Sequence, residues 1–204
     1  QRQMCIRDRL IDIGALYNQL LYIFAEEAGK KISNVLTPKE VIGLVAELIG
    51  NNKDNNSLCD PVSGSGTLLV EVGKRVGIRG VGIFGQEANW NQYALTKMNL
   101  MLNGFKDSTF FWGDSLSNPK LTDGDRLKQF DIVVSIPPFA DKWAIEEAEF
   151  DRYERFQYGI PPRSQATWAY ISHILASLKP NGRAVVVVPA GVLFRTSESK
   201  IRHQ

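Results

Sequence analysis

The 204-residue chain is long enough to form one substantial domain with a buried core. Its hydrophobic content of 44% and charged content of 23% are ordinary, and a net charge of +2 neither requires nor excludes a nucleic-acid partner. The two cysteines form neither a disulfide framework nor a metal-binding pattern, and no apolar run reaches the roughly 18 residues of a membrane span. We therefore expect no metal site, no membrane association and a reducing, cytoplasmic compartment.

The chain divides into a leader, a helical lead-in and a core. Residues 1–9 lack apolar periodicity and a start methionine, so we interpret them as an artefact or a disordered leader. Residues 10–50 are expected to form the helical lead-in. Residues 51–204 are expected to form the core, and because the chain closes just after a strand and a turn, we expect the core to be truncated at its C-terminus.

Two helices are predicted in the lead-in. Residues 10–28 have helical spacing, and the apolar side chains expected on one side are Leu16, Leu20, Ile23 and Phe24. In the second helix Thr37 is a natural N-cap, Pro38 suits the first helical position and Glu40 completes a capping box. Its predicted apolar stripe comprises Val41, Leu44, Val45, Leu48 and Ile49.

Short strands alternate with helices from residue 57 onward. Strands are predicted at residues 57–60, 80–86, 110–112, 130–135 and 183–188. Helices are predicted at residues 67–76, 90–103 and 165–178, and the last of them is expected to close at the turn formed by residues 179–182. This alternation is typical of an α/β fold with a mostly parallel sheet and helices on both faces.

The residues after the first strand are the first candidates for a binding site, because open parallel sheets bind ligands beyond the carboxyl ends of their strands. The segment reads DPVSGSGT, and its candidate residues are Asp60, Gly64, Ser65, Gly66 and Thr67. The glycines permit a tight turn and a close ligand, and the next helix offers free N–H groups. A plain strand-to-helix turn would use the same glycines. Leu69 replaces the third glycine of a dinucleotide fingerprint, which disfavours a nicotinamide dehydrogenase, and no phosphate-loop Gly-Lys-Ser/Thr follows.

Acidic residues follow the next two strands. Glu87 lies about 20 positions beyond the glycine turn, where a carboxylate can accept hydrogen bonds from both ribose hydroxyls of a nucleoside ligand. Alone, Glu87 would more often be a solvated carboxylate, but together with the turn it favours a nucleoside-type cofactor. Asp114 either accepts a hydrogen bond from the base of that ligand or caps the following segment.

The stretch FDIVVSIPPF contains the fourth strand and its end. Pro137 and Pro138 lack an N–H group, so they end the ladder and fix a rigid turn. Phe139 then presents a flat face beside their carbonyl groups, which suits a planar ring that carries an amino group. A proline-terminated strand with a core aromatic would show the same residues.

These segments, taken in order, resemble the modification subunits of type I restriction–modification enzymes, which are N6-adenine DNA methyltransferases. The resemblance runs over residues 11–195 and is carried by LTPKEV, DPVSGSGTLLVEVG, GQEANWNQYALTKMNLMLNG, GDSL, PPFADKW, YGIPPRS and HILASLKPNGRAVVVVPAGVLFR. It implies the Rossmann-like fold of class I S-adenosylmethionine-dependent methyltransferases. It also implies double-stranded DNA as substrate, and a hetero-oligomer with a specificity subunit and a restriction (nuclease) subunit.

The resemblance also implies a role for each candidate residue. Thr37 and Pro38 would shape the methionine side of S-adenosylmethionine, and the turn at Gly64, Ser65 and Gly66 would lie along it. Glu87 would bind the ribose and Asp114 would lie near the cofactor's adenine. The catalytic segment formed by Ile136, Pro137, Pro138 and Phe139 would receive a target adenine flipped out of the duplex.

The most consequential departure from the family pattern concerns a single residue. The motif begins Asn/Asp-Pro-Pro, and its polar residue accepts a hydrogen bond from the adenine amino group, whereas this chain has Ile136 there. Ser135 should point to the opposite face of the strand and would be a poor substitute. Loss of one such group costs on the order of 10²–10³ in rate. The alternatives are therefore an impaired methyltransferase or a non-catalytic subunit that binds cofactor and DNA, a sequence error at Ile136, or a motif that tolerates the change. Methylation of RNA or of a protein glutamine is a further alternative, which YGIPPRS and HILASLKPNG disfavour.

Overall fold

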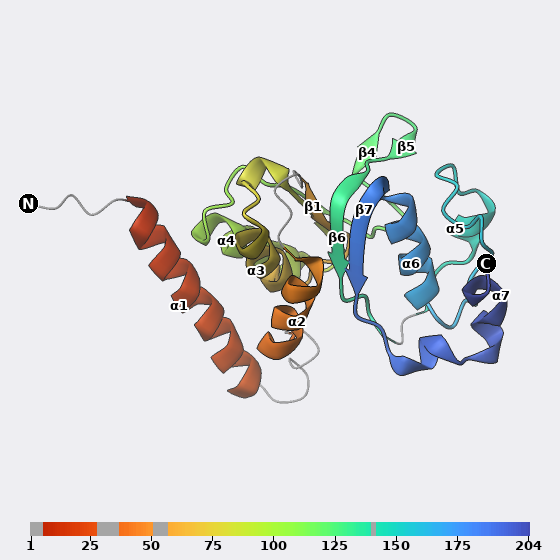
Figure 1. Cartoon of the computed structure of the whole chain (residues 1–204), viewed down its shortest axis with the longest axis horizontal. Helices are drawn as coiled ribbons and strands as arrows, with labels where there is room; N and C mark the ends of the chain where they lie inside the picture. Colours follow the sequence, from red (N-terminus) through yellow and green to blue (C-terminus); the bar gives the residue numbers. More distant parts are fainter. Residues whose placement is uncertain (1–5, 28–36, 51–56, 140–141) are drawn as a thin grey trace, which may run out of the picture.

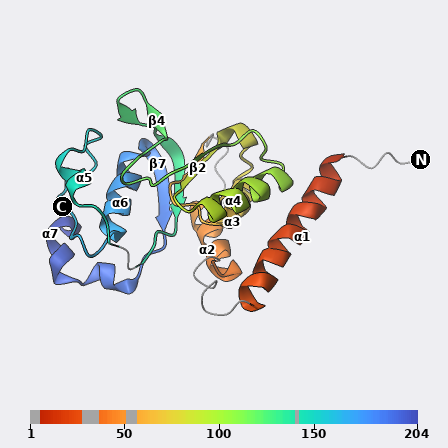
Figure 2. The ribbon, with the colours of Figure 1, turned by 180° about the vertical axis from the view of Figure 1, so that it is seen from behind.

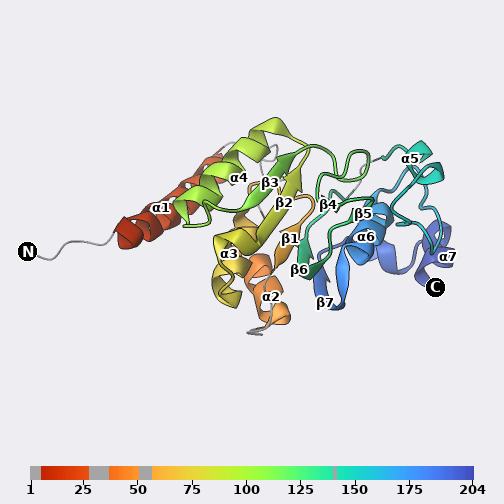
Figure 3. The same ribbon diagram turned by 90° about the horizontal axis from the view of Figure 1, so that it is seen from above.

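A parallel sheet, five-stranded within the described residues, forms the centre of the structure (Figure 1). The structure is a computed structural model, and it describes residues 6–27, 37–50, 57–139 and 142–204. The strands are β1 (Leu58–Asp60), β2 (Ile83–Glu87), β3 (Thr109–Trp112), β6 (Phe130–Ser135) and β7 (Leu178–Val186). They lie in the order β3-β2-β1-β6-β7, which Figure 3 shows from above, and all neighbours are parallel.

Helices cover both faces of the sheet, as predicted. One face packs against α2 (Lys39–Ile49), α3 (Thr67–Val76) and α4 (Trp90–Leu102), and the other against α6 (Thr167–Ala176). Alternation along β6 explains the division, because Ile132 and Val134 lie in the first core and Val133 lies in the second. Figure 2 shows the same layers from behind.

The remaining elements are short, apart from α1 (Ile6–Glu27). A small antiparallel hairpin, β4 (Thr122–Asp123) and β5 (Arg126–Leu127), precedes β6, and no strand was predicted there. The short helices are η2 (Gly80–Gly82), α5 (Glu146–Glu149), η3 (Ala190–Leu193), η4 (Thr196–Glu198) and α7 (Ser199–Arg202). Among the described residues, no helix is both long and apolar enough to cross a membrane.

Helix α1 packs on α4 through a different face from the predicted one. Gly14 and Asn18 are buried on the packed side, and the Tyr17 hydroxyl donates to the Leu95 carbonyl at 3.3 Å. Gly14 permits this approach, since a Cβ at that position would lie 2.4 Å from Oδ1 of Asn103. The predicted apolar face is exposed on the opposite side: Leu16, Leu20, Ile23 and Phe24.

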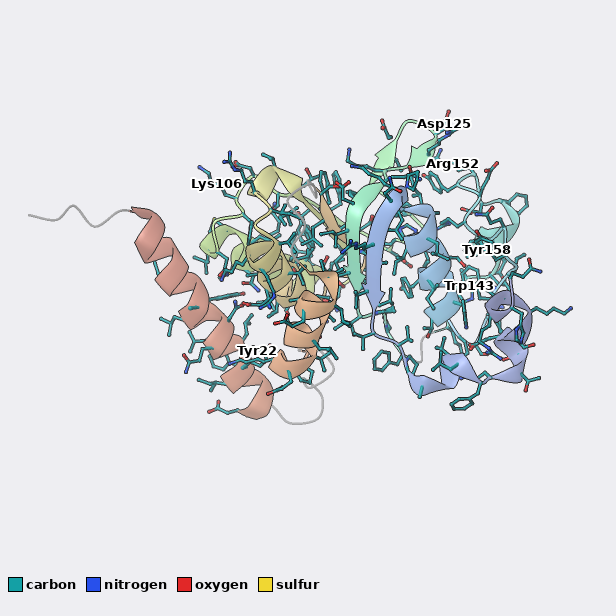
Figure 4. All side chains as sticks on the ribbon, in the orientation of Figure 1. Tyr22, Lys106, Asp125, Trp143, Arg152 and Tyr158 are labelled. Atoms are coloured by element: carbon teal, nitrogen blue, oxygen red, sulfur yellow. The ribbon has the colours of Figure 1, made fainter. Side chains whose placement is uncertain are left out.

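The start of α2 also differs from the prediction. Pro38, with an extended ψ of 140°, occupies the N-cap position, and no side chain caps the helix, so Thr37 lies one residue outside it. The Thr37 carbonyl instead accepts a hydrogen bond from the Tyr22 hydroxyl of α1 at 3.0 Å, and Figure 4 labels Tyr22 at this junction. The buried stripe of α2 is Ile42, Val45, Ala46 and Ile49, whereas Leu44 and Leu48 are exposed.

The end of α6 and the start of β7 were placed wrongly. Strand β7 begins at Leu178, before the predicted turn, and Leu178 pairs with Phe130. The next pair joins Ile132 to Arg183, so residues 179–182 form an irregularity within the strand. Residues 179–182, predicted as the turn that closes the helix, instead lie within a strand that has already begun.

Candidate active site

A cavity of about 950 Å³ lies where β1, β2, β3 and β6 end. All of the predicted site residues except Gly66 line it. They are Thr37, Pro38, Asp60, Gly64, Ser65, Thr67, Glu87, Asp114, Ile136, Pro137, Pro138 and Phe139. These residues come from segments as distant in sequence as Thr37 and Phe139, and the parallel sheet brings them together because its strands all end at the same edge.

The turn after β1 needs glycine at two positions. Gly64 has a φ of 56° and Gly66, the N-cap of α3, has a φ of 74°. A Cβ on Gly66 would lie 2.5 Å from Cγ2 of Thr96, so this residue shapes the turn from behind rather than lining the cavity. The Thr96 hydroxyl in turn donates to the Gly64 carbonyl at 2.6 Å. The strand-to-helix turn is thus fixed by helix α4.

Asp60 ends β1 with a fully buried carboxyl group. Its Oδ1 accepts the Val62 N–H at 3.0 Å. Burial raises the pKa of Asp60 to about 7, and the Val62 N–H and the nearby Ser135 hydroxyl counteract part of that rise. The Ser135 hydroxyl is itself buried and has no partner of hydrogen-bonding geometry among the described residues. Ser135 is not part of the cavity lining, unlike its neighbour Ile136.

Glu87 ends β2 and joins two loops. Its Oε2 accepts the Gly64 N–H at 2.8 Å and its Oε1 accepts the Asn89 N–H at 2.7 Å. Burial raises the pKa of the Glu87 carboxyl, and these N–H groups oppose the rise. Each carboxylate oxygen retains further acceptor capacity toward the cavity. The arrangement suits a ligand with neighbouring hydroxyl groups.

The loop after β3 is held on both sides. The Asp114 carboxylate accepts the Leu116 N–H at 2.8 Å and its carbonyl accepts the Asn118 N–H at 2.8 Å, so Asp114 caps its own loop while it lines the cavity. Gln86, which is buried, donates to the Asn118 carbonyl at 3.0 Å. The Ser115 hydroxyl donates to the Pro61 carbonyl, which ties this loop to the turn after β1.

The segment after β6 forms the other wall of the cavity. Ile136 is half-buried, Pro137 is buried, and Phe139 is 48% exposed at the mouth. Trp143, labelled in Figure 4, lines the same wall, and its indole N–H donates to the Pro162 carbonyl at 3.1 Å. The cavity therefore offers polar groups on the β1–β3 side and an apolar, aromatic surface on the β6 side.

Several lining residues had no assigned role from the sequence. The Asn89 side chain caps α4 by accepting the backbone N–H groups of Asn91 and Gln92, and its position two residues after Glu87 was a usable signal. Lys142 and Tyr170 also line the cavity, but they lie in a loop and a helix whose orientation no sequence pattern indicated. Among the described residues, no group of three or more metal-ligating side chains occurs.

The chain has clear relatives among known proteins. Residues 9–204 match the family described as N-6 DNA Methylase. The chain is 30% identical to the HindI type I restriction enzyme methylase subunit of Haemophilus influenzae, over 93% of this chain and 43% of that one. It is 33% identical to the MjaVII methylase subunit of Methanocaldococcus jannaschii, over 94% of this chain and 34% of that one. The chain thus spans less than half the length of these relatives.

Solved structures agree with this assignment. The type I restriction–modification methyltransferase subunit of Streptococcus thermophilus is 31% identical, with a TM-score of 0.73 over 82% of this chain and 37% of that one. A class I S-adenosylmethionine-dependent methyltransferase of Listeria monocytogenes, 22% identical, shares the fold with a TM-score of 0.65 over 82% of this chain and 51% of that one. Both the predicted fold class and the predicted resemblance are confirmed. The chain belongs to the N-6 DNA methylase family.

Proposed function

We propose that this chain forms the cofactor- and base-binding part of an adenine-N6 DNA methyltransferase that uses S-adenosylmethionine, as the modification subunit of a type I restriction–modification complex. One observation carries the proposal: residues from the ends of four strands line a single cavity that has a polar and an aromatic side. Family membership supports the reaction class. The specificity and nuclease subunits, and double-stranded DNA, are the partners that the proposal implies.

The polar side of the cavity fits the cofactor. S-adenosylmethionine carries a ribose, an adenine and an amino-acid group, and when bound it supplies an electrophilic methyl group. Glu87 would accept hydrogen bonds from the ribose hydroxyls with the acceptor capacity that Gly64 and Asn89 leave free. Asp114 would lie at the adenine, and Thr37 and Pro38 at the amino-acid end. Asp60, Ser65 and Thr67 complete this side.

The aromatic side fits a flipped adenine. Phe139 offers a partly exposed ring on which the base can stack, and Pro137 contributes a carbonyl acceptor for the amino group. Ile136 faces the cavity without any acceptor, so the amino group would lose one hydrogen bond. The chain's contribution to catalysis would be positioning, because the amino nitrogen would attack the methyl group directly while the bond from that methyl group to the sulfonium sulfur breaks, which leaves a neutral thioether, and the methylated nitrogen would release one proton to water.

Ile136 also favours a second candidate, a non-catalytic subunit that binds cofactor and DNA. The test is transfer of labelled methyl groups to unmethylated DNA by the full-length protein with its specificity subunit, comparing Ile136 with Ile136→Asn. The Asn variant is expected to transfer methyl groups on the order of 10²–10³ faster than the Ile136 form. Equal transfer by both forms would refute the role of the amino-group acceptor. Cofactor binding without transfer by either form would favour the non-catalytic candidate.

A further inference from the structure

A buried ion pair lies outside the cavity, behind the loop that carries Asp114. Arg155 is 3% exposed, and its Nε and Nη2 both lie 2.8 Å from Oδ1 of Asp151. Oδ2 of Asp151 accepts the backbone N–H of Arg155 at 2.6 Å. Neither residue lines the cavity, and neither had a role in the sequence analysis.

The remaining nitrogen of Arg155 reaches the cofactor side. Its Nη1 donates to the Ser115 carbonyl at 3.2 Å and to the Leu116 carbonyl at 3.0 Å. Both of these residues line the cavity and directly follow Asp114. Nη1 also lies 3.3 Å from Nδ1 of His173 on α6, which must be the acceptor because a guanidinium only donates.

The same arginine also approaches the base side, through an aromatic neighbour. Its guanidinium lies 5.2 Å from the centre of the Phe156 ring, and that ring lies 5.2 Å from the ring of Trp143. Leu116 and Trp143 share a small apolar cluster with Tyr170, and all three line the cavity. Arg155 therefore contacts the loop after Asp114 directly and reaches the Trp143 wall through the Phe156 ring.

Backbone strain accompanies this arrangement. Glu154 is the only non-glycine residue with a positive φ, 54°, among the described residues. A non-glycine residue in this region is strained and persists only where its surroundings determine it. Here the strained residue directly precedes Arg155, whose N–H is held by Asp151.

We propose that Arg155, oriented by Asp151, is a positioning residue that sets the cofactor loop at residues 114–116 against the base-side segment around Trp143. The planar guanidinium suits this role because it can bind a carboxylate on one side and two carbonyls on the other, which a lysine cannot do. The inference rests on the proposed function in that it names S-adenosylmethionine as the ligand whose binding depends on this loop.

The test separates positioning from stability. Removing Arg155 alone would leave a buried carboxylate unpaired, so the main variant is Asp151→Leu with Arg155→Met, in which both charges are replaced by apolar groups. Arg155→Lys keeps the charge but not the fork. The matched control is Glu47→Leu with Arg75→Met, which removes another ion pair, one that joins α2 to α3 away from this loop.

Two readouts are measured on the full-length protein: the dissociation constant of S-adenosylmethionine by calorimetry, and hydrogen exchange of the Leu116 and Asn118 amides. The main variant is expected to bind about tenfold more weakly, the equivalent of one lost hydrogen bond, and both amides should exchange faster. Arg155→Lys should fall between the main variant and the wild type, and the control should match the wild type.

The inference would be overturned if cofactor affinity and amide exchange stayed unchanged in the main variant. It would also be overturned if Arg155→Lys showed the affinity and the exchange rates of the wild type. Adding Asp114→Asn to the main variant gives a further check. If both changes act through the same loop, their combined loss of cofactor affinity should differ from the sum of the separate losses. If the wild type itself does not bind S-adenosylmethionine, the proposed function fails, and amide exchange alone then decides whether Arg155 positions the loop.

Discussion

Gly66 and Gly77 cap the two ends of α3, and comparing them isolates the contact that shapes the turn after β1. Both are left-handed, with φ values of 74° and 76°. A Cβ on Gly77 would meet nothing within 4 Å, whereas a Cβ on Gly66 would lie 2.5 Å from Cγ2 of Thr96. Alanine is disfavoured in the left-handed region, so its substitution should lower the free energy of unfolding by roughly 1–2 kcal/mol at both sites. At Gly66 the overpacking against Thr96 should lower it by about 1–3 kcal/mol more.

The assay is urea denaturation of Gly66→Ala and Gly77→Ala. The effect of alanine on the unfolded chain is the same in both variants, so the difference between them reports the contact with Thr96. Thr96→Ser removes the clashing methyl group but keeps the hydroxyl that donates to Gly64, and it should recover most of that difference when combined with Gly66→Ala. Equal free energies of unfolding for the two glycine variants would refute the reasoning.

Two buried titratable groups should affect stability with opposite signs. Burial raises the pKa of Asp60 from 3.8 to about 7, so the folded state binds this proton more tightly than the unfolded state does. The resulting stability, of order 4 kcal/mol, is present below about pH 4 and is lost as pH rises to above 7. Asp60→Asn should remove this loss, which is measured as the change in urea midpoint between pH 5 and pH 8. Burial, and secondarily Arg155, lower the pKa of His173 from 6.5 to about 3, so the fold should lose stability as pH falls through this range. His173→Gln should flatten the acid side of the profile, and an unchanged acid side would contradict this account.

The strand ends could be predicted from the sequence because they depend on local patterns. The apolar run of β6 stops at two prolines, and the glycine turn follows β1 directly, so both were placed within a residue or two. Parallel strands then bring their carboxyl ends to one edge without further information. This is why residues as distant as Asp60 and Ile136 were expected in one site and line one cavity.

Helix faces could not be predicted in the same way. The apolar side of α1 is exposed because Gly14 allows α4 to approach the other side more closely. In α2 the buried stripe passes through Ile42 and Ala46 rather than Leu44 and Leu48. Periodicity shows that a helix has an apolar side, but the shape of the neighbouring helix decides which side is buried.

The Asp151–Arg155 pair was beyond sequence reasoning for a related reason. Arg155 contacts Leu116, which is 39 positions away, and His173, which is 18 away, and no periodic pattern links them. A charged pair four residues apart in a loop would ordinarily be read as solvated. Only burial reveals that it supports the loop of Asp114.

Ile136 connects the question of activity with that of stability. Its side chain lines the cavity and also packs against the core cluster between the sheet and helices α2 and α3. Asparagine at this position would restore an acceptor for the adenine amino group, but it would lose part of the apolar contact, at a cost of roughly 1–2 kcal/mol. We therefore expect Ile136→Asn to gain methyl transfer while its urea midpoint falls. A variant that gained transfer without losing stability would show that Ile136 contributes little to the core, and the packing argument would then be wrong.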